Sequence, residues 1–304
     1  MRDEGDASLS EVLAEVRRIE VQSRRLVRDA MVGGWSSVFR GAGVEFEEVR
    51  EWAEGDDPRA IDWNVTARAG RPFVKKHRSE RELPVLFALD LSASSEGGFG
   101  LWSARQTAAR VVACLALAAV RTGDKVGLVA FGDRVLRRVP AQRGRAHALR
   151  IVRDALVLDA PVGRTDPGVA LDLLARAERR RAVVFLVSDF LWGTWPRALA
   201  SCARRHDVIA VRLLLPELAP PATGGLERLR DPETLASVVV DWTPQAREAY
   251  AARVARAKAR ADEALARAGV DVMDVPVPRE AGRDLVAGPI LRFFRMRELR
   301  GAKA

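Results

Sequence analysis

The chain has few of the side chains that build disulfide frameworks or zinc sites. Its 304 residues include two cysteines, three histidines and one tyrosine. Cys114 and Cys202 each lie among apolar or helix-forming residues, so we expect two small buried thiols, with no disulfide and no metal knuckle. The histidines His77, His147 and His206 are scattered among arginines, and we expect them at the surface.

Long hydrophobic segments are missing as well. The longest purely apolar run, Val111 to Val120, is too short to span a bilayer. The first residues, Met1 to Asp6, are mostly charged and lack the apolar core of a secretory signal. We therefore expect no transmembrane segment and a cytoplasmic location.

The charge balance is strongly basic. A formal net charge of +9 and a pI near 10.5 would ordinarily favour a nucleic-acid partner. Nearly all the basic residues are arginines interleaved with helix-forming residues, as at 176–181, which is typical of solvated helix faces. We therefore expect no nucleic acid, and the opposite hypothesis predicts binding with a steep salt dependence.

An alternation of buried strands and helices begins at Val85. It predicts an α/β fold with a mostly parallel sheet and helices on both faces. Because only a short Gly132-Asp133 turn separates two of the strands, we expect one antiparallel edge strand. The expected strands are 85–89, 125–131, 135–139, 183–187, 208–214 and 270–275, and the expected helices are 103–121, 145–156, 167–179, 196–204 and 245–268.

The first quarter of the chain has a different pattern. Ser8 and Glu11 form a capping-box signature before an amphipathic helix that stops at Gly33-Gly34. A short strand near 44–52 and a dense turn at 54–59 follow. We expect a small helix and strand extension over 1–82 and a main domain over 83–304, with an insertion at about 216–243 that holds a small strand at 238–241. The closing segment 283–299 is amphipathic and basic.

Oxygen-bearing side chains follow two of the predicted strands. Asp90, Ser92 and Ser94 come directly after the first strand, Asp189 follows the strand 183–187, and Thr165 lies in the loop before a helix. Carboxyl ends of parallel strands share one sheet edge, so these loops can converge on one crevice. Carboxylate and hydroxyl oxygens suit Mg²⁺ or Mn²⁺ better than zinc. Each residue taken alone also fits a turn or a helix cap.

The same five residues resemble the metal-ion-dependent adhesion site of von Willebrand factor A domains, position for position. A longer pattern is similar to the signature of the bacterial family called domain of unknown function 58, and this similarity extends from about Leu13 to Leu299. Its motif residues here are Glu45, Arg50, Gly55, Asp56, Asp57, Arg59, Asp62, Trp63 and Arg68.

The resemblance implies a Rossmann-like von Willebrand factor A fold and a function. Relatives are usually encoded beside a MoxR-type AAA+ ATPase, so the implied role is a non-enzymatic, metal-dependent adaptor in chaperone-like activation of client proteins. The implied cofactor is Mg²⁺ or Mn²⁺, and the client would offer a carboxylate to the metal. No GxxxxGK[ST] phosphate loop occurs in the sequence, consistent with a chain that does not hydrolyse ATP itself.

Other interpretations remain open at this point. A phosphoryl-transfer hydrolase could use Asp90 as nucleophile, but Ser92 stands where its acid/base carboxylate would be. In the 45–68 motif, the acids either pair with neighbouring arginines while Trp52 and Trp63 pin the small layer to the sheet, or form an acidic docking surface. After Ser94 the chain departs from the family pattern, and we expect the extra acid Glu96 to alter the metal shell.

Overall fold

The computed structural model describes most of the chain from residue 83 onward and shorter pieces before it. The described residues are 14–21, 48–53, 61, 63–76, 83–98, 100–159, 163–192, 195, 197–282 and 284–301. Several predicted features therefore lie outside the described residues: Ser8, Glu11, Gly33, Gly34, His77 and the motif residues Glu45, Gly55, Asp56, Asp57, Arg59 and Asp62.

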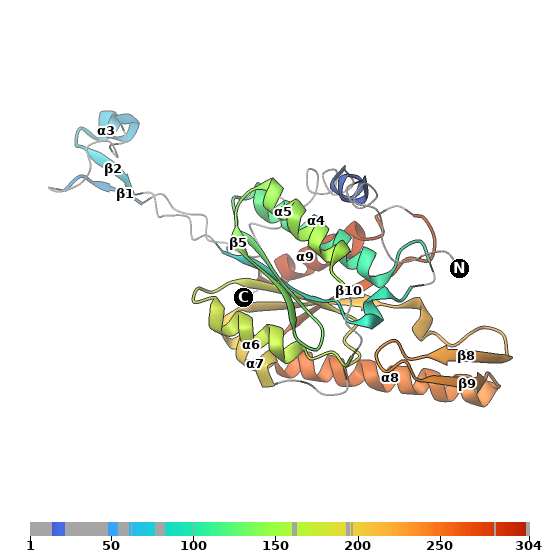
Figure 1. The fold of residues 1–304 in the computed structure, drawn as a ribbon. Helices are drawn as coiled ribbons and strands as arrows, with labels where there is room; N and C mark the ends of the chain where they lie inside the picture. The colour runs from blue at the N-terminus through green and yellow to red at the C-terminus, as the bar shows by residue number, and fades with distance from the viewer. Residues whose placement is uncertain are drawn as a thin grey trace.

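A six-stranded sheet forms the centre of the molecule (Figure 1). Its order is β10-β7-β6-β3-β4-β5, with every neighbouring pair parallel except β4 and β5. The strands are β3 Val85–Asp90, β4 Val126–Phe131, β5 Val135–Gln142, β6 Val183–Ser188, β7 Asp207–Leu214 and β10 Asp271–Pro276. This confirms the predicted α/β fold, including its single antiparallel edge strand.

Helices cover both faces of this sheet, above and below it in Figure 1. One face carries α4 Ala104–Arg121, α5 Arg145–Val157 and α9 Ala287–Gly301, and the other carries α6 Pro167–Ala177, α7 Arg197–Arg205 and α8 Pro244–Arg267. The two faces hold separate apolar clusters, because alternate residues of each buried strand point to opposite sides. Strands buried on both faces explain the continuous apolar runs in the sequence.

The helix boundaries follow from local signals. Ser103 and Gln106 form a reciprocal capping box at the start of α4, and the Asp166 carboxylate accepts from the Gly168 N–H at the start of α6. Gly269, at φ +68°, adopts the left-handed conformation that follows α8. Helix α6 ends two residues earlier than the expected 179, at Ala177.

The extension before residue 83 differs from expectation. It contains β1 Glu48–Glu51, α3 Trp63–Ala69 and β2 Phe73–Lys76, with β1 and β2 antiparallel, whereas only the first strand was predicted. Trp63 is 71% exposed and Trp52 is 36% exposed. The expectation that these two tryptophans pin the layer to the sheet is therefore wrong, since a ring that anchors a layer must be covered.

The expected burial is correct for the two cysteines, whereas the expected exposure is wrong for one histidine. Cys114 and Cys202 are free and buried, as predicted. His206 is only 2% exposed, its Nδ1 accepts from the Ala182 N–H at 3.3 Å, and burial lowers its pKa. The half-buried His147 lies 3.0 Å from the Val126 carbonyl through Nε2. The expected surface position is thus wrong for His206, because its ring is buried against the backbone that leads into β6.

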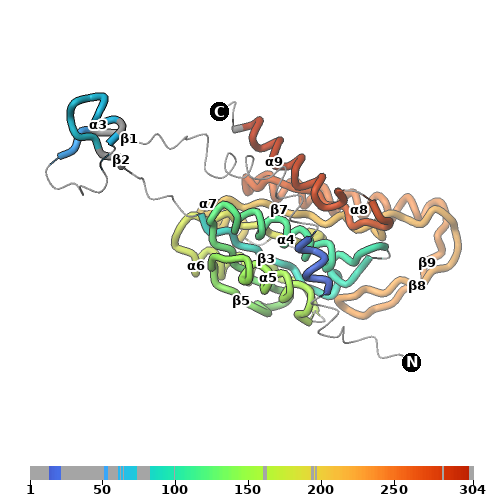
Figure 2. Tube along the Cα trace, turned by 90° about the horizontal axis from the view of Figure 1, so that it is seen from above, coloured from blue at the N-terminus to red at the C-terminus, as the bar shows by residue number. Residues whose placement is uncertain are grey.

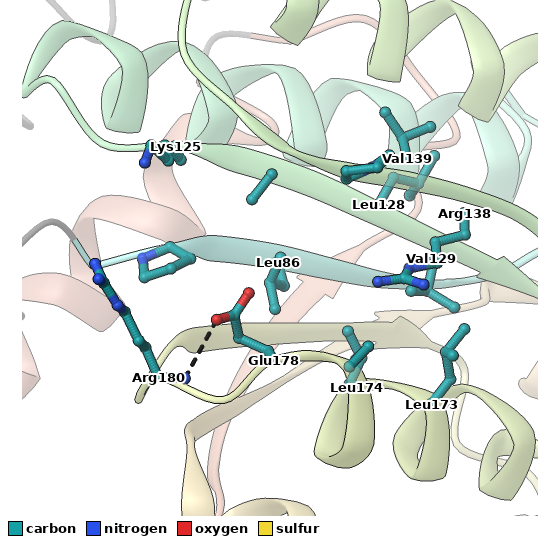
Figure 3. Close-up of a pocket in the computed structure, with 14 residues that line it drawn as sticks. Leu86, Lys125, Leu128, Val129, Arg138, Val139, Leu173, Leu174, Glu178 and Arg180 are labelled. Carbon is teal, nitrogen blue, oxygen red and sulfur yellow. Dashed lines mark hydrogen bonds between the residues drawn. The ribbon is translucent and has the colours of Figure 1, made fainter.

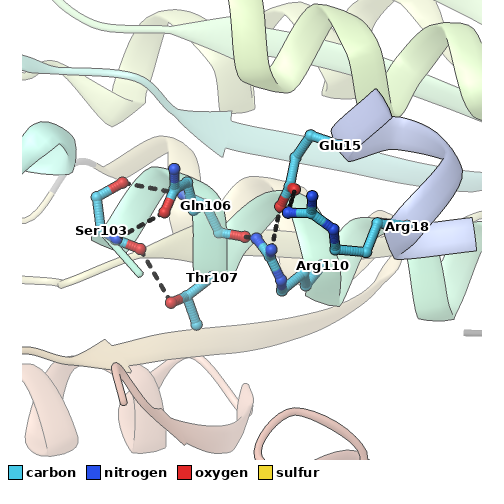
Figure 4. Close-up of polar contacts among 6 residues, drawn as sticks. All are labelled: Glu15, Arg18, Ser103, Gln106, Thr107 and Arg110. Atoms are coloured by element: carbon cyan, nitrogen blue, oxygen red, sulfur yellow. Dashed lines mark hydrogen bonds and ion pairs between the residues drawn. The ribbon is translucent and has the colours of Figure 1, made fainter. Parts of the chain in front are cut away.

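A short helix at residues 14–21 packs against the sheet domain. Its Val16 and Ile19 are buried beside α4 and α5, as the helical spacing predicts. Figure 4 shows the polar side of this contact, in which Glu15 pairs with Arg110 of α4 and with Arg18. The Arg110 side chain is 5% exposed and its guanidinium lies 3.9 Å from the centre of the Trp102 ring. Burial lowers the pKa of Arg110 against the opposing effect of Glu15.

We expect Glu15→Gln to lower the free energy of unfolding by about 2 to 4 kcal/mol, because it leaves the buried Arg110 charge without its carboxylate. Chemical denaturation measures this loss. Arg18→Gln is the matched control, since Arg18 touches the same carboxylate but is 65% exposed, and it should change stability by less than about 0.5 kcal/mol. Equal effects of the two substitutions would contradict the buried-pair interpretation.

Between β7 and α8 the chain makes a short helix, η4 Pro216–Leu218, and a hairpin of β8 Leu226–Arg230 and β9 Ser237–Asp241. Figures 1 and 2 both place this hairpin beside the first part of α8. Trp242 links them, since its ring meets Tyr250 edge-on at 5.3 Å and its Nε1–H donates to Glu227 at 2.7 Å. The predicted insertion at about 216–243 includes the whole hairpin.

None of the helices in the part of the chain just described has the combination of length and apolar character needed to cross a membrane.

Candidate functional site

The five predicted site residues lie around one edge of the sheet. Strands β3 and β6 are neighbours, yet β3 connects onward to β4 on one side and β6 connects to β7 on the other. The sheet therefore has its topological switch point between them, where open α/β sheets leave a crevice. Asp90 ends β3 and Asp189 directly follows β6, so both carboxylates lie at that point.

Asp90 is the buried centre of the site, with 6% exposure. Its Oδ1 accepts from the Ser92 N–H at 3.0 Å, and its Oδ2 accepts from the Ser188 hydroxyl at 2.7 Å and the Trp192 Nε1–H at 3.4 Å. Burial raises the pKa of Asp90, and these donors lower it in part. A hydrogen bond from the Ser92 side chain lowers the pKa as well.

Hydroxyl groups line the approach to Asp90. The Ser92 and Ser94 Oγ atoms are 3.0 Å apart, held by the short helix η3 Ala93–Glu96. Ser95 is 8% exposed, and no hydrogen-bond partner for its hydroxyl is found among the described residues. A cavity of about 10 Å³ lies among Asp90, Ser94, Ser95, Ala104, Ser188, Asp189 and Leu213. This volume is close to that of one water-sized sphere.

Asp189 is the second carboxylate of the crevice and is half-buried. Burial raises the pKa of Asp189 from 3.8 to about 6, and the charges of Asp90 and, to a smaller extent, Glu233 raise it too. The Leu191 N–H donates to its Oδ1 at 3.0 Å and lowers the pKa in part, as does the Ser94 side chain. The crevice thus holds two negative groups that repel one another.

The pKa of Asp189, raised by burial and by the charge of Asp90, predicts a pH dependence for the metal-free protein. The folded state holds the Asp189 proton more tightly than the unfolded state, so the favourable contribution is complete below pH 3.8 and is lost as the pH rises through about 6. Relative to Asp189→Asn, we expect wild-type stability to fall by about 1 to 2 kcal/mol between pH 4 and pH 7.5. Thermal unfolding in EDTA across this range measures the difference, and parallel curves for the two proteins would contradict it.

Thr165 contacts Glu233, a residue that the sequence patterns did not predict near the site. Its hydroxyl donates to the Oε1 of Glu233 at 2.9 Å, and Glu233 lies in the turn between β8 and β9. Ser188 and Trp192, which donate to Asp90, were missed as well. The run Asp231-Pro232-Glu233 predicts a turn at this position of the chain. No sequence pattern predicts that this turn contacts Thr165, because the two are 68 residues apart.

Glu96 forms an ion pair and is not among the residues that line the small cavity, and its expected effect on a metal shell stays a prediction. Its carboxylate pairs with the Arg105 guanidinium at 2.7 Å and is 53% exposed. Since Arg105 neutralises this acid, the structure gives no support to an extra metal ligand at Glu96.

The longer sequence motif does not join the crevice in the described residues. Arg50 lies in β1, whereas Trp63 and the exposed Arg68 lie at the two ends of α3, and neither element contains a crevice residue. The choice between a structural and a docking role for this motif stays a prediction.

The donor set of the crevice fits a hard divalent cation. Two carboxylates, the hydroxyls of Ser92 and Ser94 and the unpartnered Ser95 hydroxyl surround or adjoin the small cavity. Such neutral and anionic oxygens are the ligands that Mg²⁺ accepts. Among the residues that the structure describes, no group of three or more His, Cys, Asp or Glu able to hold a metal occurs, so a cation here would depend on two carboxylates together with hydroxyl oxygens.

A second cavity lies toward the opposite edge of the sheet (Figure 3). Its volume is about 390 Å³, and its walls include Leu86 near the start of β3, Lys125 before β4 and Arg180 after α6. Parallel strands begin at this edge, whereas Asp90 lies where β3 ends. The cavity is therefore separate from the crevice.

The fold and the crevice define an α/β protein with an oxygen-lined site at its switch point. The chain belongs to the family described as "Protein of unknown function DUF58", whose model matches residues 48–260. The uncharacterized protein Mb1516 of Mycobacterium bovis is 31% identical over 306 residues, covering 99% of this chain and 94% of that protein. The uncharacterized protein MAV169 of Mycobacterium avium is 34% identical over 173 residues, covering 56% and 98%.

Solved structures show more distant likenesses. The conserved hypothetical protein BatB from Bacteroides thetaiotaomicron matches with a TM-score of 0.44 and 18% identity, over 73% of this chain and 100% of that chain. The SpRpn10 VWA domain matches with a TM-score of 0.40 and 10% identity, over 69% and 94%. These likenesses are too distant to bear on the site.

Proposed function

We propose that this protein is a non-enzymatic protein-interaction module that depends on a divalent metal, with Mg²⁺ or Mn²⁺ held by Asp90, Ser92, Ser94, Thr165 and Asp189. We propose further that it is the adaptor of a MoxR-type AAA+ ATPase in the activation or assembly of client proteins. The convergence of two carboxylates with the hydroxyls of Ser92 and Ser94 at the switch point is the observation that carries the proposal.

The electrostatics of the crevice support a cation. Burial raises the pKa of both Asp90 and Asp189, and the charge of Asp90 raises the pKa of Asp189 further, so the crevice disfavours its own charges. A bound cation would supply the missing positive charge and, because the hydroxyl ligands are neutral, would keep an affinity for one more carboxylate. A partner's Asp or Glu is the chemistry that such a site would recognise.

The proposed absence of catalysis rests on how Asp90 is held. A nucleophilic carboxylate needs an oxygen that can reach substrate, whereas Asp90 is 6% exposed and both of its oxygens accept hydrogen bonds from its own chain. Ser188 and Ser92, its nearest donors, are also buried and carry no charge to stabilise a phosphoryl group. These contacts favour a carboxylate that holds a cation over one that attacks a substrate.

The test is co-purification with a MoxR-type ATPase from the same genome. Wild-type protein should retain the ATPase in Mg²⁺ and release it in EDTA, and Asp90→Ala should fail to retain it in either buffer. Binding that survives both EDTA and the substitution would exclude a metal-bridged contact. A phosphatase activity lost in Asp90→Ala would instead favour the hydrolase interpretation.

A further inference from the structure

The β8–β9 hairpin has one exposed strand that is almost entirely apolar. Strand β9 has the sequence SVVVD, and its Val238 and Val239 are 58% and 57% exposed. Because neighbouring residues of a strand point to opposite faces, β9 meets solvent on both faces. Figures 1 and 2 show the hairpin extending past the end of the six-stranded sheet. Exposed apolar edge strands favour pairing with another strand, and an isolated two-stranded hairpin gains little stability in water.

The hydrogen-bond pattern of the hairpin shows which backbone groups of β9 face outward. The Trp242 N–H donates to the Gly225 carbonyl at 2.9 Å. In an antiparallel ladder, hydrogen-bonded and non-hydrogen-bonded residue pairs alternate. The pair of Val239 and Arg228 lies three positions along the register from this bond, so it is a non-hydrogen-bonded pair. The N–H and C=O groups of Val239 therefore point away from β8, toward the outer edge of the hairpin.

Helix α8 covers one face of the hairpin and leaves that edge exposed. Trp242 is buried and packs against Tyr250 of α8, and the half-buried Leu229 and Val240 lie on the same face as Trp242. Within the described part of the chain, no backbone hydrogen bond joins Val239 to an element outside the hairpin. The outer edge of β9 thus combines outward backbone groups with exposed apolar side chains.

We propose that β9 is a self-association surface, at which two copies of this chain pair their β9 strands antiparallel about a two-fold axis at Val239. An isologous contact needs a surface that complements itself. In this register Val239 faces its own counterpart and Val238 faces Val240 of the second copy, so β-branched apolar side chains meet at the centre. The two hairpins then form one continuous sheet. This contact lies outside the crevice and goes beyond the metal-dependent function proposed above.

The charges of the hairpin favour β9 over β8 for this pairing. At each end of the paired strands Ser237 faces Asp241 of the second copy, and Arg230 lies beside Ser237 on the same face. The small serine leaves Arg230 room to approach that aspartate, and symmetry repeats this contact of opposite charges. Self-pairing of β8 in the equivalent register would place Arg228 against its own counterpart, and like charges directly opposite one another are destabilising.

Sedimentation velocity of the full-length chain in EDTA tests the proposal without any metal-bridged contact. We expect wild type to shift from monomer to dimer between about 1 and 200 µM, since so small an interface gives weak affinity. Val239→Pro should stay monomeric, because proline removes the outward N–H, yet an edge strand tolerates proline where the N–H faces solvent. Arg228→Pro is the matched control, since its N–H also points outward but on β8, and it should dimerise as wild type does.

A cross-link tests the register directly. Hydrogen-bonded antiparallel pairs have Cα atoms about 5.5 Å apart, which is within disulfide range, so Val239→Cys should form a covalent dimer in oxidised glutathione. Arg228→Cys should give only background cross-linking, and the native Cys114 and Cys202 are buried.

Four results would overturn the proposal. These are a wild type that stays monomeric up to about 200 µM, a dimer that persists in Val239→Pro, equal dissociation of both proline variants, and equal cross-linking of the two cysteine variants. If circular dichroism shows that Val239→Pro is unfolded, the comparison of the cysteine variants decides. Because every measurement is made in EDTA, none of these failures bears on the cation site.

Discussion

Asp90→Asn should abolish Mn²⁺ binding while leaving the protein folded. The carboxylate is the buried centre of the crevice, and its loss removes charge that the neighbouring hydroxyls cannot replace. Residues that only orient a metal ligand typically contribute 10- to 100-fold in affinity, so the loss of this central ligand should exceed about 100-fold. Calorimetric titration with Mn²⁺ at pH 7.5 measures the effect.

The same substitution should make the metal-free protein more stable. Burial raises the pKa of Asp90, so its charged form is disfavoured in the folded state, and a neutral amide of the same shape avoids that cost. At pH 8 in EDTA we therefore expect a higher melting temperature for Asp90→Asn than for wild type. Opposite signs for metal affinity and metal-free stability are typical of a binding residue, whereas a structural residue would lose both.

Asp166→Asn is the matched control for both measurements. Asp166 lies next to Thr165, is exposed, and caps α6 by accepting from the Gly168 N–H at 2.8 Å. Asparagine caps helices as well as aspartate does, so Mn²⁺ affinity should stay within about 3-fold of wild type. If the two substitutions weaken Mn²⁺ binding equally, the effect is one of net charge and the assignment of Asp90 as a ligand is wrong.

Phe87→Ala should lower the free energy of unfolding by about 3 to 5 kcal/mol. Phe87 in β3 and Phe185 in β6 are paired in register, both are fully buried, and their rings stack with centroids 5.7 Å apart and planes inclined by 18°. Truncation would remove the Phe87 ring, deprive the Phe185 ring of its stacking contact, and leave a cavity in the larger apolar cluster. Urea denaturation followed by circular dichroism measures the loss.

Phe87→Ala should also weaken Mn²⁺ binding several-fold. The paired strands end at Asp90 and Ser188, so their packing sets the distance between the two sides of the crevice.

Two other substitutions serve as controls for the stability measurement. Phe87→Leu, which refills most of the space, should lower the free energy of unfolding by about 1.5 kcal/mol or less. Trp63→Ala removes an aromatic ring that is 71% exposed and should cost less than about 0.5 kcal/mol. A cost for Phe87→Ala as small as that for Trp63→Ala would contradict the packing described for β3 and β6.

Sequence patterns were most reliable where one physical rule acts over a short span. Strand β3 and helix α4 were predicted within a residue of their ends, because an apolar run between polar turns and a capping box at Ser103 are local signals. The 63–76 region was largely missed, since α3 and β2 are short and mixed in composition. His206 was expected to be exposed and is buried, whereas Trp63 was expected to be covered and is exposed. Both expectations were wrong because burial depends on elements distant in the sequence.

By itself, the amino-acid sequence determined the α/β class, the order and type of the main elements, and the position of Asp90 and Asp189 at strand ends. These follow from hydrophobic periodicity and turn chemistry, which act between near neighbours. Only the tertiary structure decided that Ser188 holds Asp90, that Arg105 neutralises Glu96, and that Glu233 reaches Thr165. Those contacts join residues separated by 98, 9 and 68 positions, and the packing of helices and strands, which no local pattern encodes, brings them together.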